Sequence, residues 1–108
     1  MKYKKPEEVT SPKELIKNVQ VIFDGGDGLN GTQGYSIAIL EDHEGKFSIG
    51  MRWNVSHREY DDTDKCNNVT ECVGNPQSRG YSTWLILPKD GVFLTNINNA
   101  LKKLNEKR

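Results

Sequence analysis

The segment from Lys46 to Asn54, with the sequence KFSIGMRWN, alternates two kinds of side chain and so constrains the fold more than any other. One set consists of large apolar residues, Phe47, Ile49, Met51 and Trp53. The other set consists of small or cationic residues, Lys46, Ser48, Gly50 and Arg52. A period of two is typical of a half-buried β-strand. We expect the apolar set to supply a core and the second set to lie on an open surface.

Three further strands and two helices are predicted around this strand. Strands are expected at 19–23, 35–41 and 81–87, in addition to 47–53, and their spacing favours an antiparallel meander. The run Ser-Pro-Lys-Glu at 11–14 has the form of a capping box and predicts a short N-terminal helix. A C-terminal helix at 92–104 is predicted from an apolar stripe of Phe93, Ile97, Ala100, Leu101 and Leu104. The predicted class is α+β, a four-stranded antiparallel sheet followed by a C-terminal helix packed on one face.

The length of 108 residues indicates one domain with a thin core, since only 34% of the residues are hydrophobic. Residues 1–10 are expected to form a flexible tail, and residues 11–108 a single domain with a long polar loop at 55–80. A sheet with one covering helix leaves apolar surface, which favours a homodimer.

Charge and hydropathy narrow the class of protein. Fifteen basic and fifteen acidic residues give a formal net charge of zero, which argues against a strong, non-specific polyanion binder. No apolar run approaches the roughly 20 residues that span a bilayer. The first residues, MKYKKPEE, lack the apolar stretch of a secretory signal. We therefore expect a cytoplasmic protein that contacts no membrane.

The polar segment 55–80 holds the residues that could suggest a metal or an active site. Cys66 and Cys72 are separated by five residues, unlike the tight pair of a zinc knuckle, and two free thiols are the expectation, with a disulfide as the alternative. Asp61, Asp62 and Asp64 lack the glycine and glutamate spacing of a calcium loop. No catalytic spacing surrounds either histidine. We expect no enzyme activity, no metal and no cofactor; a hydrolase built on one cysteine with His57 is the weakest alternative.

Basic and aromatic residues form the remaining candidate site. Lys46 and Arg52 project from one face of the strand at 47–53, Arg79 precedes the last strand, and Trp84 is out of phase with its core-facing neighbours. Together they would form a platform on which single-stranded bases stack beside cations. The alternative is that Trp84 packs under a loop or in a dimer interface.

The element order, with IGMRWN at 49–54 and YSTWLILP at 81–88, resembles the transcriptional coactivator family called positive cofactor four. The resemblance covers roughly residues 19–104. It implies a curved antiparallel sheet backed by one helix, dimerisation through that helix and binding of single-stranded DNA on the sheet. By position, Arg52 would contact phosphate, Trp84 would be an aromatic on the strand before the helix, and Lys46 would lie at the mouth of the same face.

The functional expectation is a homodimeric, non-enzymatic protein that binds single-stranded DNA or RNA. Its predicted site consists of Lys46, Arg52, Arg79 and Trp84, and its predicted role is that of an accessory factor in transcription or DNA maintenance. The alternative is a protein-interaction module that docks a protein partner through the sheet or the acidic loop.

Overall fold

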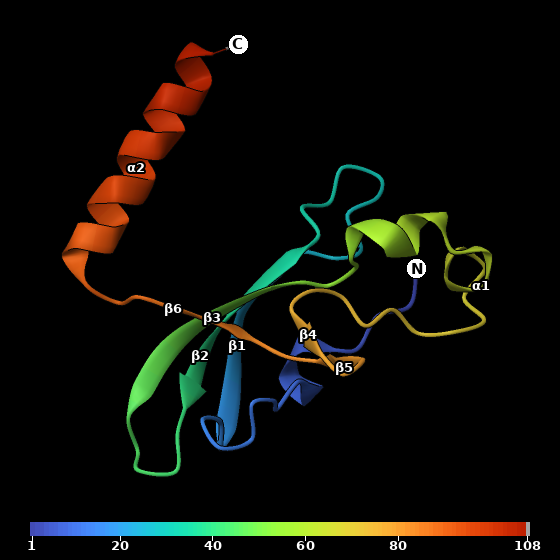
Figure 1. The fold of residues 1–108 in the computed structure, drawn as a ribbon, viewed down its shortest axis with the longest axis horizontal. Coiled ribbons are helices and arrows are strands. Elements are labelled where there is room, and N and C mark those ends of the chain that lie inside the picture. Colours follow the sequence, from blue (N-terminus) through green and yellow to red (C-terminus); the bar gives the residue numbers. More distant parts are fainter. Residues whose placement is uncertain (108) are drawn as a thin grey trace.

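A four-stranded antiparallel sheet lies at the centre of the computed structural model, which describes residues 1–107 (Figure 1). Its strands follow the order β1-β2-β3-β6. They are β1 (Asn18–Asp24), β2 (Tyr35–Glu41), β3 (Phe47–Trp53) and β6 (Leu85–Leu87). The predicted α+β class and four-stranded antiparallel sheet are confirmed. In the part of the chain described, no helix is long and apolar enough to cross a membrane.

The inward side of the sheet is the opposite of the one predicted. Gly50 and Arg52 of β3 are buried, whereas Phe47 and Trp53 are exposed. Gly50 explains this choice, because an added Cβ would lie 2.6 Å from Leu40 Cδ1 and 3.1 Å from the Trp84 ring. The missing side chain lets the two large residues pack directly against the strand.

The core is small and lies on this inward side. It consists of Val9, Ile16, Ala38, Leu40 and Trp84. Val9 and Ile16 come from the segment before β1. Residues 1–10, predicted to be a flexible tail, thus include the buried residues Pro6 and Val9 and pack against the sheet. Apolar burial holds the N-terminal segment against the sheet, and the Met1 ammonium group lies 2.7 Å from Asp27 Oδ2.

The predicted N-terminal helix after Ser11 is absent within residues 1–107. The segment contains instead a 3₁₀ helix, η1 (Pro6–Glu8), followed by turns. The carbonyl of Ser11 accepts a hydrogen bond from the Trp84 N–H at 3.0 Å, and Lys17 donates its N–H to the Glu41 carbonyl. These long-range bonds, with the burial of Ile16, direct the chain into β1 rather than into a helix.

The last predicted strand, 81–87, is divided in two. β5 (Tyr81–Ser82) pairs with β4 (Gln77–Ser78) in a hairpin that turns at Arg79 and Gly80, both at positive φ. The chain then leaves this hairpin at Thr83 and Trp84, and only β6 joins the main sheet, beside β3.

The segment 55–80 contains more regular structure than predicted. A 3₁₀ helix, η2 (His57–Asp61), and a single helical turn, α1 (Thr63–Cys66), follow β3. Asn75 then pairs with Trp53 at the end of β3 through two backbone hydrogen bonds. The loop is thus tied to the sheet at both ends.

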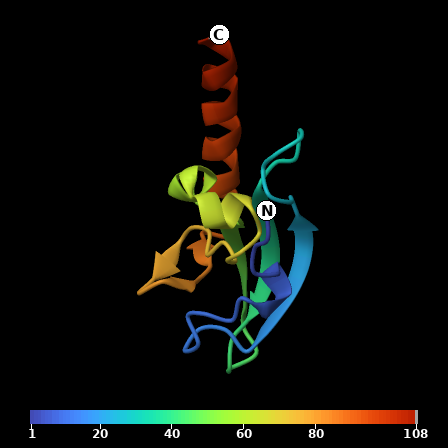
Figure 2. The same ribbon diagram turned by 90° about the vertical axis from the view of Figure 1, so that its right-hand side faces the viewer.

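The C-terminal helix α2 (Gly91–Glu106) forms as predicted, with the Asp90 side chain accepting the N–H of Phe93 at 2.8 Å. It does not pack on the sheet, which corrects the prediction. Both views show α2 projecting away from the strands (Figures 1 and 2), and none of its described residues is buried. The Lys89 ammonium group donates to the Phe47 carbonyl and so holds the connector at the edge of the sheet.

Candidate functional site

Arg52, the predicted phosphate contact, lies in the interior with 1% of its surface exposed. Its Nη1 and Nη2 atoms donate to the carbonyls of Thr83 and Val73. Burial lowers the pKa of the guanidinium to about 10, partly offset by the negative charge of Glu59, so the group remains protonated at neutral pH. Arg52 therefore joins β3 to the segments that follow it and cannot contact a nucleic-acid backbone.

Trp84 is likewise buried, with 3% of its surface exposed. Its indole Nε1–H donates to the Val9 carbonyl at 2.6 Å, across 75 residues of sequence. The stacking role predicted for Trp84 is wrong in this structure, and the alternative, in which Trp84 packs in the interior, fits the geometry.

Lys46 and Arg79 are exposed but lie in different elements. Lys46 is in the turn between β2 and β3, where its ammonium group is 3.5 Å from Glu44. Arg79 lies at the tip of the β4–β5 hairpin. The structure thus brings together no cationic platform from the four predicted residues.

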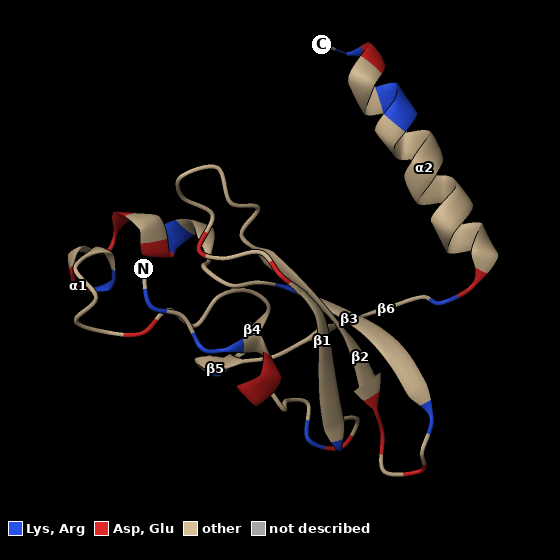
Figure 3. Cartoon of the chain, turned by 180° about the vertical axis from the view of Figure 1, so that it is seen from behind, with Lys and Arg blue, Asp and Glu red and all other residues tan. Residues whose placement is uncertain are grey.

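A broad apolar surface lies on the outward side of the sheet, which we call the open face. Register places ten apolar or aromatic residues on this side: Phe23, Tyr35, Ile37, Ile39, Phe47, Ile49, Met51, Trp53, Leu85 and Leu87. All ten are exposed or half-buried. Three polar residues, Asn18, Gln20 and Glu41, lie on the same side towards the start of β1 and the end of β2. Charged residues lie mainly at the strand ends and in the loops (Figure 3). The apolar set in β3 is the sequence signal for this surface, although alternation alone predicts that this set faces the core.

An aromatic row crosses one end of the open face. The ring centroids of Phe23 and Tyr35 are 5.4 Å apart, and those of Tyr35 and Trp53 are 5.8 Å apart. A register shift in β1 between Val21 and Phe23 brings Phe23 opposite Ile37, on this side of the sheet. The row gives the surface rigid, contiguous contact area.

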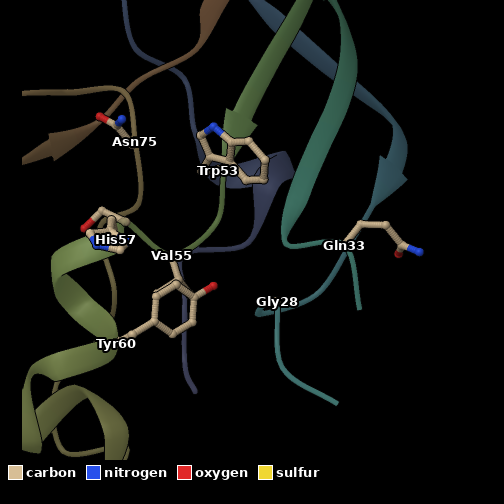
Figure 4. A pocket seen from close by; sticks show the side chains of 8 residues that line it. Gly28, Gln33, Trp53, Val55, His57, Tyr60 and Asn75 are labelled. Atoms are coloured by element: carbon tan, nitrogen blue, oxygen red, sulfur yellow. The ribbon is translucent and has the colours of Figure 1, made fainter. Parts of the chain in front are cut away.

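Two hollows adjoin Trp53. One, of about 160 Å³, lies between β3 and β6 and includes Met51, Leu85 and Pro76 among its walls. The other, of about 330 Å³, lies beyond the end of β3, with Trp53, His57 and Tyr60 around it (Figure 4). The Tyr60 hydroxyl already donates to the Asp27 carbonyl at 2.6 Å. The smaller hollow offers the open face a place for an apolar side chain.

The two cysteines are free thiols in different surroundings. Cys66 is exposed, whereas Cys72 is buried, and this burial together with the charge of Glu59 raises the pKa of Cys72 to about 11. Within residues 1–107, no group of three His, Cys, Asp or Glu side chains is placed to hold a metal ion. The absence of metal, cofactor and catalysis stays a prediction.

We expect native protein at pH 8 to react rapidly with a thiol reagent at one cysteine only, because the thiolate is the reactive form and Cys72 is both buried and protonated. Cys66→Ser should abolish the fast reaction, whereas Cys72→Ser should retain it. Both cysteines should react in urea. Equal labelling of the two native thiols would contradict the burial of Cys72.

Comparisons with protein-family models, curated proteins and solved structures found no match to this chain. The resemblance to positive cofactor four therefore stays a prediction, and the functional argument depends on the open face.

Proposed function

We propose that this chain is a non-enzymatic protein-interaction module whose open face binds the apolar stripe of an amphipathic helix. The supporting observation is the open face itself, an uncovered apolar surface that crosses β6, β3 and β2 and reaches Phe23 of β1. Monomeric proteins rarely leave such a surface uncovered unless it binds something. Two free thiols suit the reducing cytoplasm, where we place this interaction.

Charge favours a protein partner over a nucleic acid. Binding of single strands combines stacking with a cationic groove that follows the phosphates. None of the ten apolar or aromatic residues of the open face is cationic, and two lysines close in sequence to the ends of its strands are already engaged, Lys46 with Glu44 and Lys89 with the Phe47 carbonyl. The aromatic row could stack bases, but these ten residues supply no cation to hold the backbone.

The dimensions of the open face suit a helix. Seven residues of β3 extend about 23 Å, and four strands span roughly 14 Å. A helix with side chains is about 10 Å wide, so one helix covers this surface along its length. Its apolar stripe would contact the open face while its polar side remained in water.

A labelled 16-residue leucine–lysine helical peptide provides a direct test by fluorescence anisotropy. We expect it to bind the full chain carrying Leu101→Asp, in which the chain's own apolar helix cannot compete, and to lose at least tenfold in affinity when Leu85→Asp is added, because that change places a charge within the apolar contact. Leu15→Asp in the same background, at an equally exposed site outside the open face, should leave binding unchanged. Equal binding by both variants, or salt-sensitive binding of a single-stranded 20-mer instead, would refute the proposal.

A further inference from the structure

We propose that the helix bound by the open face is α2 of a second copy, so that two chains exchange their C-terminal helices reciprocally. This inference rests on the proposed function of the open face and names its partner. Three observations support it: the uncovered apolar stripe of α2, the match of α2 to the open face in length and polarity, and the direction in which α2 leaves its own sheet.

Helix α2 carries an apolar stripe that nothing in the described chain covers. The stripe, which we call the helix stripe, consists of Phe93, Leu94, Ile97, Ala100, Leu101 and Leu104. Its residues are exposed, apart from a half-buried Phe93. An isolated helix of 16 residues is marginally stable in water, and amphipathic helices gain most of their stability from tertiary packing. Helix α2 therefore needs an apolar surface to lie against.

The helix stripe and the open face match in length and in polarity. Sixteen residues of helix extend roughly 24 Å, close to the length of β3. The charged residues Lys102, Lys103 and Glu106 all lie off the helix stripe. Glu41, which register places on the open side of the sheet, is the last residue of β2 and accepts a hydrogen bond from the Asn18 amide, so it lies at the edge of the contact. The 160 Å³ hollow beside Leu85 can receive one of the leucine side chains.

The connector directs α2 away from its own sheet. β6 is an edge strand, and Lys89, two residues after it, is held by the Phe47 carbonyl at the start of β3. From there α2 extends into solvent (Figures 1 and 2), which leaves both the helix stripe and the open face of the same chain uncovered. A twofold axis would place each helix on the other sheet and close the assembly.

The area of such an exchange suits a stable dimer. A helix of this size on a sheet buries on the order of 800 Å², so that two reciprocal contacts bury about 1,600 Å², the standard size of a specific interface. A single contact falls short of it. The dimer is therefore expected to be stable only when both contacts form together.

Light scattering after size exclusion tests the inference with the full chain at 200 µM. We expect a mass of twice 12.2 kDa for the wild type. Leu101→Asp, on the helix stripe, and Leu85→Asp, on the open face, should each give a monomer with an unchanged sheet signal in circular dichroism. Val92→Asp is the matched control, because Val92 is exposed on the same helix but off the helix stripe, and it should remain a dimer.

Mixing the two monomeric variants separates exchange from other dimers. One chain in the mixture offers an intact open face and the other an intact helix stripe, so one contact can form, and we expect a weak heterodimer that neither variant forms alone. A wild-type dimer that neither substitution affects would overturn the exchange. A wild-type monomer that still binds the leucine–lysine peptide through Leu85 would overturn it but leave the proposed function standing. A monomer that binds no peptide would overturn both.

Discussion

Trp84→Ala should lower the free energy of unfolding by about 3–5 kcal/mol, the range for truncation of a large buried aromatic residue. Trp84 is the largest member of a core of five residues and packs against Leu40 over Gly50. Few other side chains are available to fill the space that it would leave. Urea denaturation followed by circular dichroism measures the change.

Two controls separate packing from hydrogen bonding. Trp84→Phe retains much of the ring but leaves the Val9 carbonyl without the indole N–H, so it should cost about 1–3 kcal/mol. Trp53→Ala removes the other indole, which is 46% exposed, and should cost less than Trp84→Ala. If Trp84→Ala were no more destabilising than Trp53→Ala, Trp84 would not be part of the core.

The three long strands could be predicted to within a residue or two because their signals are local. Alternation defines each strand, and Asp42 and Gly45 mark the turn between β2 and β3. Alternation does not show which side of a strand faces inward. That choice depends on Trp84 and Leu40, which meet over Gly50 from distant parts of the sequence.

The candidate site could not be predicted for the same reason. Arg52 has the sequence context of an exposed cation, yet in the interior its two terminal nitrogens donate to the carbonyls of residues 73 and 83. The burial of Val9 likewise depends on the indole of Trp84, 75 residues away. The helix stripe was visible in the sequence, but an apolar stripe does not reveal whether it packs on its own chain or on another.

Glu59 should make the folded state of this protein less stable at acidic pH. The side chain is 5% exposed and follows Ser56, with which it forms a capping box at the start of η2. Its Oε2 atom lies 2.6 Å from the Lys65 ammonium group and accepts the Val73 N–H, and Oε1 accepts the N–H groups of Ser56 and Gly74. Burial alone would raise the pKa, but these bonds to the charged form outweigh it and lower the pKa of Glu59 from 4.5 to about 2.

A lowered pKa contributes its full stabilisation of the folded state only where the carboxylate is charged in both the folded and the unfolded states. The contribution of Glu59 is therefore fully present above pH 4.5 and is lost as the pH falls towards 2. The difference between the two pKa values corresponds to about 3 kcal/mol. Because Gln resembles protonated Glu in shape, Glu59→Gln should be less stable than the wild type by about this amount at pH 7.

The difference between wild type and Glu59→Gln should shrink as the pH falls below 4.5 and should nearly vanish near pH 2. Urea unfolding midpoints of both proteins, measured at pH 7, 5, 4, 3 and 2.5, report this difference in stability. The other carboxyl groups titrate in both proteins, so their contribution cancels when one pH curve is subtracted from the other. Glu71→Gln, at an exposed position of the same segment, should remain within about 0.5 kcal/mol of the wild type throughout. If the difference in stability between wild type and Glu59→Gln stayed constant with pH, the Glu59 side chain would contribute through its shape and not through its charge.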